Sequence, residues 1–137
     1  MSYLIDTNVL SELRKKTATP SVVEWFKSIN PESLYISVLT LGEIKKGVEQ
    51  VGNIKKRALL SDWLEVTLPA YFRGRVLPVD EAVAYRWGAM LAALNERRPA
   101  IDSLLAATAA FHDLVFVTRN TKDVAGLAVK VFNPWQD

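Results

Sequence analysis

The sequence contains no cysteine and only one histidine, and these two absences limit its chemistry. Without thiols there is no disulfide bond, no thiolate metal site and no cysteine nucleophile. A single imidazole excludes ribonuclease mechanisms that use two histidines as acid and base, and metal sites with several histidine ligands. Any catalysis therefore has to depend on carboxylates, hydroxyls and a hard cation. The lack of cysteine also fits a cytoplasmic location.

Long apolar runs are also missing. The longest stretches without a charged residue are ten residues, Ser33–Gly42 and Ser103–His112, whereas a membrane-spanning helix needs about twenty. Asp6 directly follows Met1–Ile5, so the N-terminus does not resemble a signal peptide. Of the 137 residues, 50% are hydrophobic and 23% are charged, which excludes intrinsic disorder. We expect a single domain over residues 1–137 that does not contact a membrane.

The charge is nearly balanced, with a net value of +2 and no basic arm in either half of the chain. Basic residues nevertheless gather in short groups, at positions 14–16, 45–46, 55–57, 73–75 and 97–98. A solvated helix face is a sufficient explanation for any one group. Taken together they allow an anionic partner, because Lys and Arg supply most protein contacts to phosphates.

Short apolar runs alternate with helical patterns along the chain. The runs are β-branched or aromatic, as expected for strands buried on both faces, and they are Tyr3–Ile5, Leu34–Ile36, Arg75–Leu77, Leu114–Val117 and Val129–Phe132. Helices are expected at 7–15, 55–72, 80–98 and 101–111. In the second of these, the residues expected to face inward are Leu59, Leu60, Trp63 and Leu64. The alternation predicts a three-layer α/β/α sandwich with a mostly parallel sheet of four or five strands.

Acidic residues follow the predicted strands, at the edge of the sheet where ligands gather in such folds. Asp6 ends the first strand, Glu43 lies in the helix after the second, Asp102 opens the helix before the fourth, and Asp123 follows that strand. Each also has a purely structural interpretation. Asp6 fits a helix cap, Glu43 a capping box with Thr40, Asp102 a helix N-terminus and Asp123 a braced turn.

The structural interpretations do not explain why the four acids converge on one edge. Carboxylates brought together in an apolar cleft repel one another by several kcal/mol. A hard divalent cation such as Mg²⁺ or Mn²⁺ neutralises them with oxygen ligands alone. Such an ion also lowers the pKa of a bound water and stabilises charge on a phosphodiester. The pattern therefore favours a metal-dependent hydrolase of nucleic acid.

Four segments resemble, in order, the motifs of PIN-domain nucleases, and they are Leu4–Leu13, Ile36–Ile44, Asp102–Ala109 and Val117–Asp123. Two further stretches, Leu77–Asp80 and Asn133–Trp135, are similar to the VapC/FitB-like toxins of bacterial toxin–antitoxin pairs. The resemblance covers essentially the whole chain and implies a PIN-like fold. One departure is Val124, where the family pattern has an aromatic residue after the fourth acid.

The resemblance also implies roles for individual residues. Asp6, Glu43 and Asp102 would bind the metal, and Asp123 would be a fourth acidic ligand, directly or through water. The supporting polar groups that orient carboxylates and waters would be Thr7, Asn8, Ser37, Thr118 and Asn120. One or two Mg²⁺ or Mn²⁺ ions would activate a water that cuts RNA and leaves a 5′-phosphate and a 3′-hydroxyl.

By the same resemblance the partners would be an RNA substrate, a cognate antitoxin and a second copy of the chain, with a higher toxin–antitoxin assembly as an extension. The apolar helical region around Leu59, Trp63 and Leu64 is one antitoxin-binding surface to consider, although core packing explains it nearly as well. The alternative function is a catalytically silent PIN-like module that binds RNA or protein. Intact acids at all four motif positions count against that alternative.

Other chemistry-bearing residues receive structural interpretations. Asp80 precedes a strong amphipathic pattern and is expected to cap that helix. His112 is expected at a helix C-terminus, where a cation is favoured, and not in a metal site. The four tryptophans are expected to anchor the core or an interface, and they are Trp25, Trp63, Trp87 and Trp135.

Overall fold

The structure, a computed structural model, describes residues 1–136 and contains a five-stranded parallel sheet. Its strands are β1 (Tyr3–Ile5), β2 (Leu34–Ser37), β3 (Val76–Leu77), β4 (Val115–Val117) and β5 (Val131–Phe132). They lie in the order β3-β2-β1-β4-β5, so the first strand of the chain occupies the centre. Tyr3 pairs with Leu34 on one side and with Val115 on the other. All five predicted strands are confirmed, and the last three are shorter than expected.

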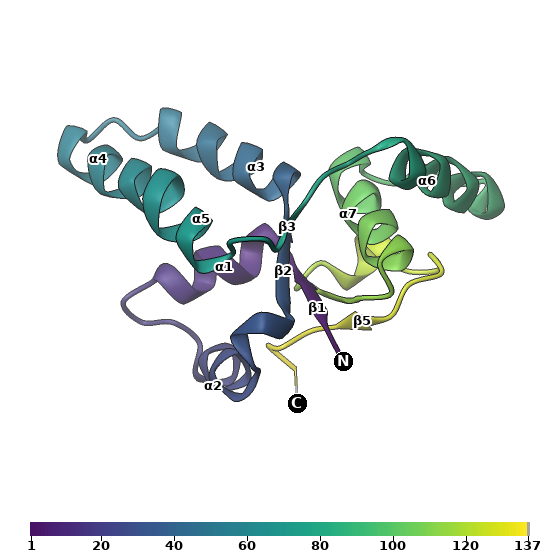
Figure 1. The fold of residues 1–137 in the computed structure, drawn as a ribbon, viewed down its shortest axis with the longest axis horizontal. Helices are drawn as coiled ribbons and strands as arrows, with labels where there is room; N and C mark the ends of the chain where they lie inside the picture. Colours follow the sequence, from purple (N-terminus) through teal and green to yellow (C-terminus); the bar gives the residue numbers. More distant parts are fainter. Residues whose placement is uncertain (137) are drawn as a thin grey trace.

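Helices cover both faces of this sheet (Figure 1). One layer contains α1 (Thr7–Arg14), α2 (Pro20–Ser28), α3 (Val38–Glu49), α4 (Ile54–Asp62), the π-helical turn η2 (Trp63–Thr67) and α5 (Leu68–Tyr71). The opposite layer contains α6 (Glu81–Leu94) and α7 (Ala100–Phe111). Two short 3₁₀ turns, η1 (Pro31–Ser33) and η3 (Thr121–Val124), complete the described elements. The three-layer α/β/α prediction is therefore confirmed.

Each layer packs its own core against the sheet. Ile5 and Ile36 are fully buried against α1 to α5, in a cluster that includes Phe72. Leu4 and Phe116 are fully buried on the other face, against α6 and α7. Successive strand residues point to opposite faces, so a strand that is apolar throughout is buried on both sides. This is why the sequences of the strands are continuous apolar runs.

The predicted helix over 55–72 is confirmed as a helical stretch with an internal irregularity. Pro69 has no N–H and its ring clashes with the preceding turn, and the wider π turn Trp63–Thr67 lies directly before it. The expectation that Leu59 faces inward is wrong, because 69% of its surface is exposed. Leu60, Trp63 and Leu64 do pack on the core. Within α4 only Leu60 and Ser61 are partly buried, and the other residues of the helix, Leu59 among them, are exposed.

The helix expected over 80–98 ends earlier than predicted. It starts after Asp80, whose Oδ1 accepts the Val83 N–H at 3.0 Å, so the predicted cap is confirmed. It stops at Leu94 because Asn95 adopts the left-handed conformation with φ of 53°, four residues before Pro99. Asn tolerates that conformation better than most residues. No helix within residues 1–136 is long and apolar enough to cross a membrane.

Candidate acidic active site

The acids predicted from the sequence come together at the carboxyl ends of the parallel strands. Asp6 follows β1, Glu43 lies in α3, Asp102 lies in the first turn of α7, and Asp123 lies in η3 after β4. The first three line an open cleft of about 400 Å³. Asp123 does not line this cleft, but it is near enough to Asp102 to raise the pKa of that residue. Residues far apart in the sequence thus form one acidic cluster.

Asp6 is held by both of its carboxylate oxygens and is only 3% exposed. Oδ1 accepts the Thr7 N–H at 2.7 Å and so caps α1. Oδ2 accepts the Thr118 hydroxyl at 2.7 Å and the Asn8 amide at 3.2 Å. Burial raises the pKa of Asp6 above its ordinary value, and repulsion from Glu43 adds to the rise against these hydrogen bonds. Capping and a place in the cleft are therefore compatible roles for this residue.

The strand-end residue Thr118 connects several of the predicted supporting groups. It is fully buried, and besides binding Asp6 its Oγ1 accepts the Asn120 N–H at 3.0 Å and lies 3.4 Å from the Asn8 amide nitrogen. Asn8 in turn accepts the Arg119 N–H at 3.4 Å. This network links the ends of β1 and β4 and fixes the direction of the Asp6 carboxylate.

Glu43 accepts the Thr7 hydroxyl at 2.6 Å, which ties α3 to α1 across the cleft. The capping-box interpretation for Glu43 is wrong, because the N-cap of α3 is Ser37 and not Thr40. The Ser37 hydroxyl accepts the Leu39 N–H at 3.0 Å and is fully buried, so this predicted supporting residue lies at the base of α3 and not on the cleft surface. Glu43 is thereby left available to the cleft.

Asp102 shows the strongest electrostatic signature of the cluster. Burial raises its pKa to about 6, and repulsion from Asp6, Asp123 and Glu43 adds to the rise together with the hydrogen bond to Asp123. All three other acids contribute, so each lies close enough to Asp102 for its charge to act on it. Ionising Asp102 therefore has two costs, the loss of solvent around its carboxylate and repulsion from the neighbouring acids.

The side chains of this cluster offer oxygen ligands, which are the ligands that a hard divalent cation prefers. Burial disfavours the charged forms of Asp6 and Asp102, and repulsion between the acids adds to that effect. A bound positive charge would oppose both. Among residues 1–136, no three acidic, histidine or cysteine side chains form a group that could hold a metal ion by themselves. A cation in this cleft would therefore be held by one or two carboxylates, with waters as its remaining ligands.

The sequence pattern missed several residues that line the cleft, and they are Ser11, Glu12, Lys15, Arg119 and Trp135. Glu12 is only 5% exposed and accepts hydrogen bonds from the Thr19 N–H at 2.9 Å and the Thr19 hydroxyl at 3.0 Å. It also pairs with Lys15 at 3.0 Å. The Thr19 N–H first, and then Lys15, lower the pKa of Glu12 to about 2. The available signal was the helical spacing of Asn8, Glu12 and Lys15 along α1.

The remaining predictions concern residues outside the cleft. Val124 is 1% exposed and packs between the sheet and α7, so the departure from the family pattern is a core substitution. His112 is the C-cap residue of α7, as expected, and its ring contacts Phe111 edge-on. All four tryptophans pack on a core cluster, as expected. Trp135 also lines the cleft.

Comparisons with known proteins agree with this geometry. The family model described as "PIN domain" matches residues 3–127. The chain is 37% identical to "Toxin FitB" of Neisseria gonorrhoeae, over 98% of this chain and 99% of that protein. It is 30% identical to "VapC ribonuclease Y4jK" of Sinorhizobium fredii, over 97% of each protein.

Solved structures give the same answer for the fold. The crystal structure of FitAcB from Neisseria gonorrhoeae contains a chain that superposes with a TM-score of 0.91 at 36% identity, covering 98% of this chain and 99% of that one. A toxin–antitoxin complex from Klebsiella pneumoniae superposes with a TM-score of 0.70 at 26% identity, covering 97% of this chain and 98% of that one. On its sequence, its fold and its acidic cleft, the chain belongs to the PIN-domain family.

Proposed function

We propose that this protein is an endoribonuclease that uses Mg²⁺ or Mn²⁺ and acts as the toxin of a toxin–antitoxin pair. The observation that carries the proposal is geometric: Asp6, Glu43 and Asp102, far apart in the sequence, line one cleft at the carboxyl ends of the strands. Relatives of nearly the same length named as a toxin and as a ribonuclease support it. Cellular RNA as the substrate places its action in the cytoplasm.

The residues of the cleft would have two kinds of role, binding the cation and positioning the carboxylates. Asp6, Glu43 and Asp102 would hold the cation, directly or through its bound waters, and Asp123 would steer Asp102 or join it as a ligand. Thr118 and Asn8 fix the Asp6 carboxylate, and Thr7 fixes Glu43. The bound ion would supply a water of lowered pKa and positive charge for the phosphodiester as it is attacked. No covalent enzyme intermediate is required.

The test is cleavage of total bacterial RNA by the purified chain, followed by sequencing of the new 5′ ends. We expect fragments with a 5′-phosphate in Mg²⁺ or Mn²⁺ and none in EDTA. Asp102→Asn should abolish cleavage without unfolding the protein. Asp62→Asn on α4 is the matched control, because Asp62 is exposed and lies outside the cleft. Absence of cleavage by the parent in either metal would overturn the proposal in favour of a silent binding module.

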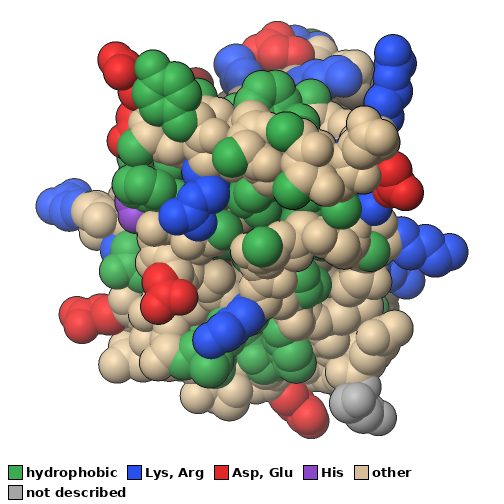
Figure 2. Space-filling view, turned by 90° about the vertical axis from the view of Figure 1, so that its right-hand side faces the viewer, with side chains coloured by type: hydrophobic (Ala, Val, Ile, Leu, Met, Phe, Trp, Pro, Cys, Tyr) green, Lys and Arg blue, Asp and Glu red, His purple; other side chains and the backbone are tan. Residues whose placement is uncertain are grey.

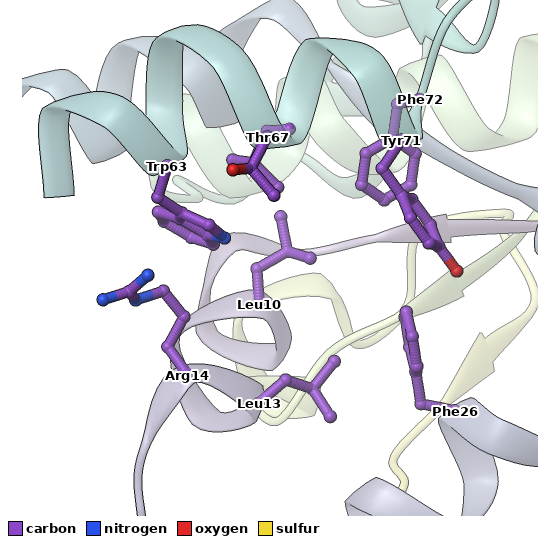
Figure 3. A pocket seen from close by; sticks show the side chains of 9 residues that line it. Leu10, Leu13, Arg14, Phe26, Trp63, Thr67, Tyr71 and Phe72 are labelled. Atoms are coloured by element: carbon purple, nitrogen blue, oxygen red, sulfur yellow. The ribbon is translucent and has the colours of Figure 1, made fainter. Parts of the chain in front are cut away.

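We further propose that the antitoxin occupies an apolar groove beside the acidic cleft. The groove has a volume of about 210 Å³ and lies between α1, α2 and the helical stretch of η2 and α5 (Figure 3). Its walls include Leu10, Leu13, Phe26, Trp63 and Tyr71. Of the surface expected from the sequence, Trp63 faces this groove, Leu64 belongs to the core, and Leu59 is exposed on α4.

A second copy of the chain would need a different face. On the face covered by α6 and α7, apolar side chains lie among charged ones (Figure 2). Large apolar residues exposed on these two helices are Tyr85, Ile101 and Phe111, with Tyr85 exposed by 76%. These residues support the proposal of a homodimer through α6 and α7, which sedimentation analysis of a Tyr85→Asp variant tests.

A further inference from the structure

Arg119 stands out among the cleft residues because of what its side chain contacts. It follows β4 directly, its side chain is exposed, and its backbone N–H is fixed by Asn8. The guanidinium carbon lies 5.0 Å from the centre of the Trp135 ring. Within residues 1–136 the guanidinium forms no ion pair, although it shares the cleft with Asp6, Glu12 and other acids.

Trp135 is a rigid support for this arginine. Its ring packs on the core, and its backbone N–H donates to Asn133 Oδ1 at 2.9 Å. The buried indole N–H finds no partner among the described residues, so the position of the ring is set by packing. A planar guanidinium over an indole ring is attracted by the ring face and loses little freedom on binding a further group.

The other cation of the cleft serves a different purpose. Lys15 is paired with Glu12 at 3.0 Å, and this carboxylate also holds the loop at Thr19. Lys15 is therefore engaged in structure, whereas the Arg119 side chain is exposed and its guanidinium has no ion pair among the described residues. A guanidinium that contacts an aromatic ring and has no carboxylate partner is available to an anion from outside, and its fork of donors matches a phosphate.

We propose that Arg119, positioned by Trp135, binds a backbone phosphate of the RNA next to the bond that is cut. This inference rests on the proposed ribonuclease function. It assigns to Arg119 the task of holding the strand across the acidic cleft, where the carboxylates alone would repel it. Trp135 is a positioning residue that acts through Arg119.

Binding without cleavage is the direct test. The protein is the Asp102→Asn variant, and the probe is a fluorescein-labelled single-stranded RNA of about twelve nucleotides with mixed sequence, followed by anisotropy over a range of salt concentrations. Adding Arg119→Ala should weaken binding about tenfold and reduce the slope of log K against log salt by about 0.7, the value for one lost phosphate contact on a single strand. Arg119→Lys should keep the slope but recover only part of the affinity, because lysine lacks the planar fork.

The matched control removes the same charge elsewhere. Arg73 is exposed and lies between α5 and β3, at the amino ends of the strands, so Arg73→Ala should change neither affinity nor slope. Trp135→Leu should weaken binding severalfold with an unchanged slope, since the charge stays but loses its support. In the active protein, Arg119→Ala should raise KM more than it lowers kcat.

The outcomes separate this inference from the function on which it rests. If the parent cuts RNA and the Asp102→Asn protein binds it, but Arg119→Ala binds equally well or loses no more than Arg73→Ala, the role of Arg119 is wrong and the ribonuclease proposal stands. If the parent neither cuts nor binds RNA, both proposals fall. A tenfold loss confined to Arg119→Ala, with the shallower slope, supports the phosphate contact.

Discussion

At the scale of single residues, the two carboxylate oxygens of Asp6 explain why a helix cap and a residue of the acidic cleft cannot be told apart in the sequence. One oxygen of Asp6 satisfies the first turn of α1, and the other is fixed by Thr118 from the far end of the chain. The local partner is visible in the sequence as an ordinary N-cap pattern. The distant partner is 112 residues away, so only the fold reveals it.

The raised pKa of Asp102 predicts that the cleft destabilises the metal-free protein. Because the folded value is about 6 against 3.8 for a free carboxyl, the folded state holds the proton more tightly, and stability falls as pH rises through that window. After allowance for solvent screening, Asp102→Asn should be more stable by about 1 to 2 kcal/mol at pH 7.5 in EDTA. Thermal melts should show this gap closing by pH 4, and equal stability of the two proteins at pH 7.5 would contradict it.

Glu12 predicts the opposite pH dependence. Its folded pKa of about 2 lies below the ordinary value of 4.5, so its ionised form stabilises the fold above pH 4.5 and that contribution is lost as pH falls toward 2. Glu12→Gln should lower the melting temperature by a few degrees at pH 7, with the gap shrinking on acidification. Glu49→Gln is the control, because Glu49 forms an exposed pair with Lys45 and should change the melting temperature much less.

At the scale of elements, the sequence predicted whether a segment is a helix or a strand better than it predicted the residues at which the segment begins and ends. All five apolar runs became strands, and the three central ones, β1, β2 and β4, are largely buried on both faces, which local composition records. The end of α6 at Asn95 and the exposure of Leu59 depend on which neighbours cover a helix. Glu12 was missed because a charged residue on a helix looks solvated until a distant segment, here the loop at Thr19, covers it. Arg119 was missed because its contact with Trp135 depends on the fold.

Asp80 gives the element-scale prediction, because it is an acid near the strand ends whose role is structural. Its side chain caps α6 through the Val83 N–H, so Asp80→Ala should lower the free energy of unfolding by about 1 kcal/mol. RNA cleavage per folded molecule should not change. Denaturant melts and initial cleavage rates measure the two effects, with Glu81→Ala as the neighbour that keeps the cap. A loss of activity at full folding would assign Asp80 to the site.

At the scale of the whole molecule, the site depends on segments that span most of the chain. Asp6 lies between β1 and α1, and the other acids come from α3, α7 and η3, so both helical layers and the sheet between them contribute. Anything that binds the four acids together therefore stabilises the entire fold.

Metal should accordingly raise the melting temperature, and more so at neutral pH. At a Mn²⁺ concentration about a hundred times the dissociation constant, the gain should be about 2.7 kcal/mol. The gain should be smaller at pH 5.5 than at pH 7.5, because Asp102 with a pKa of about 6 must lose its proton to bind. Asp102→Asn should show a reduced response. Identical responses at both pH values would exclude Asp102 as a ligand.

The central place of β1 in the sheet has a consequence for how the protein is made. The first strand to leave the ribosome finds β2 early, but its other neighbour, β4, is among the last segments to be synthesised. Thr118, which fixes Asp6, arrives with that late strand. A nascent chain that has not reached β4 lacks both Thr118 and Asp123, so the acidic cleft can be completed only when translation of the polypeptide is nearly finished.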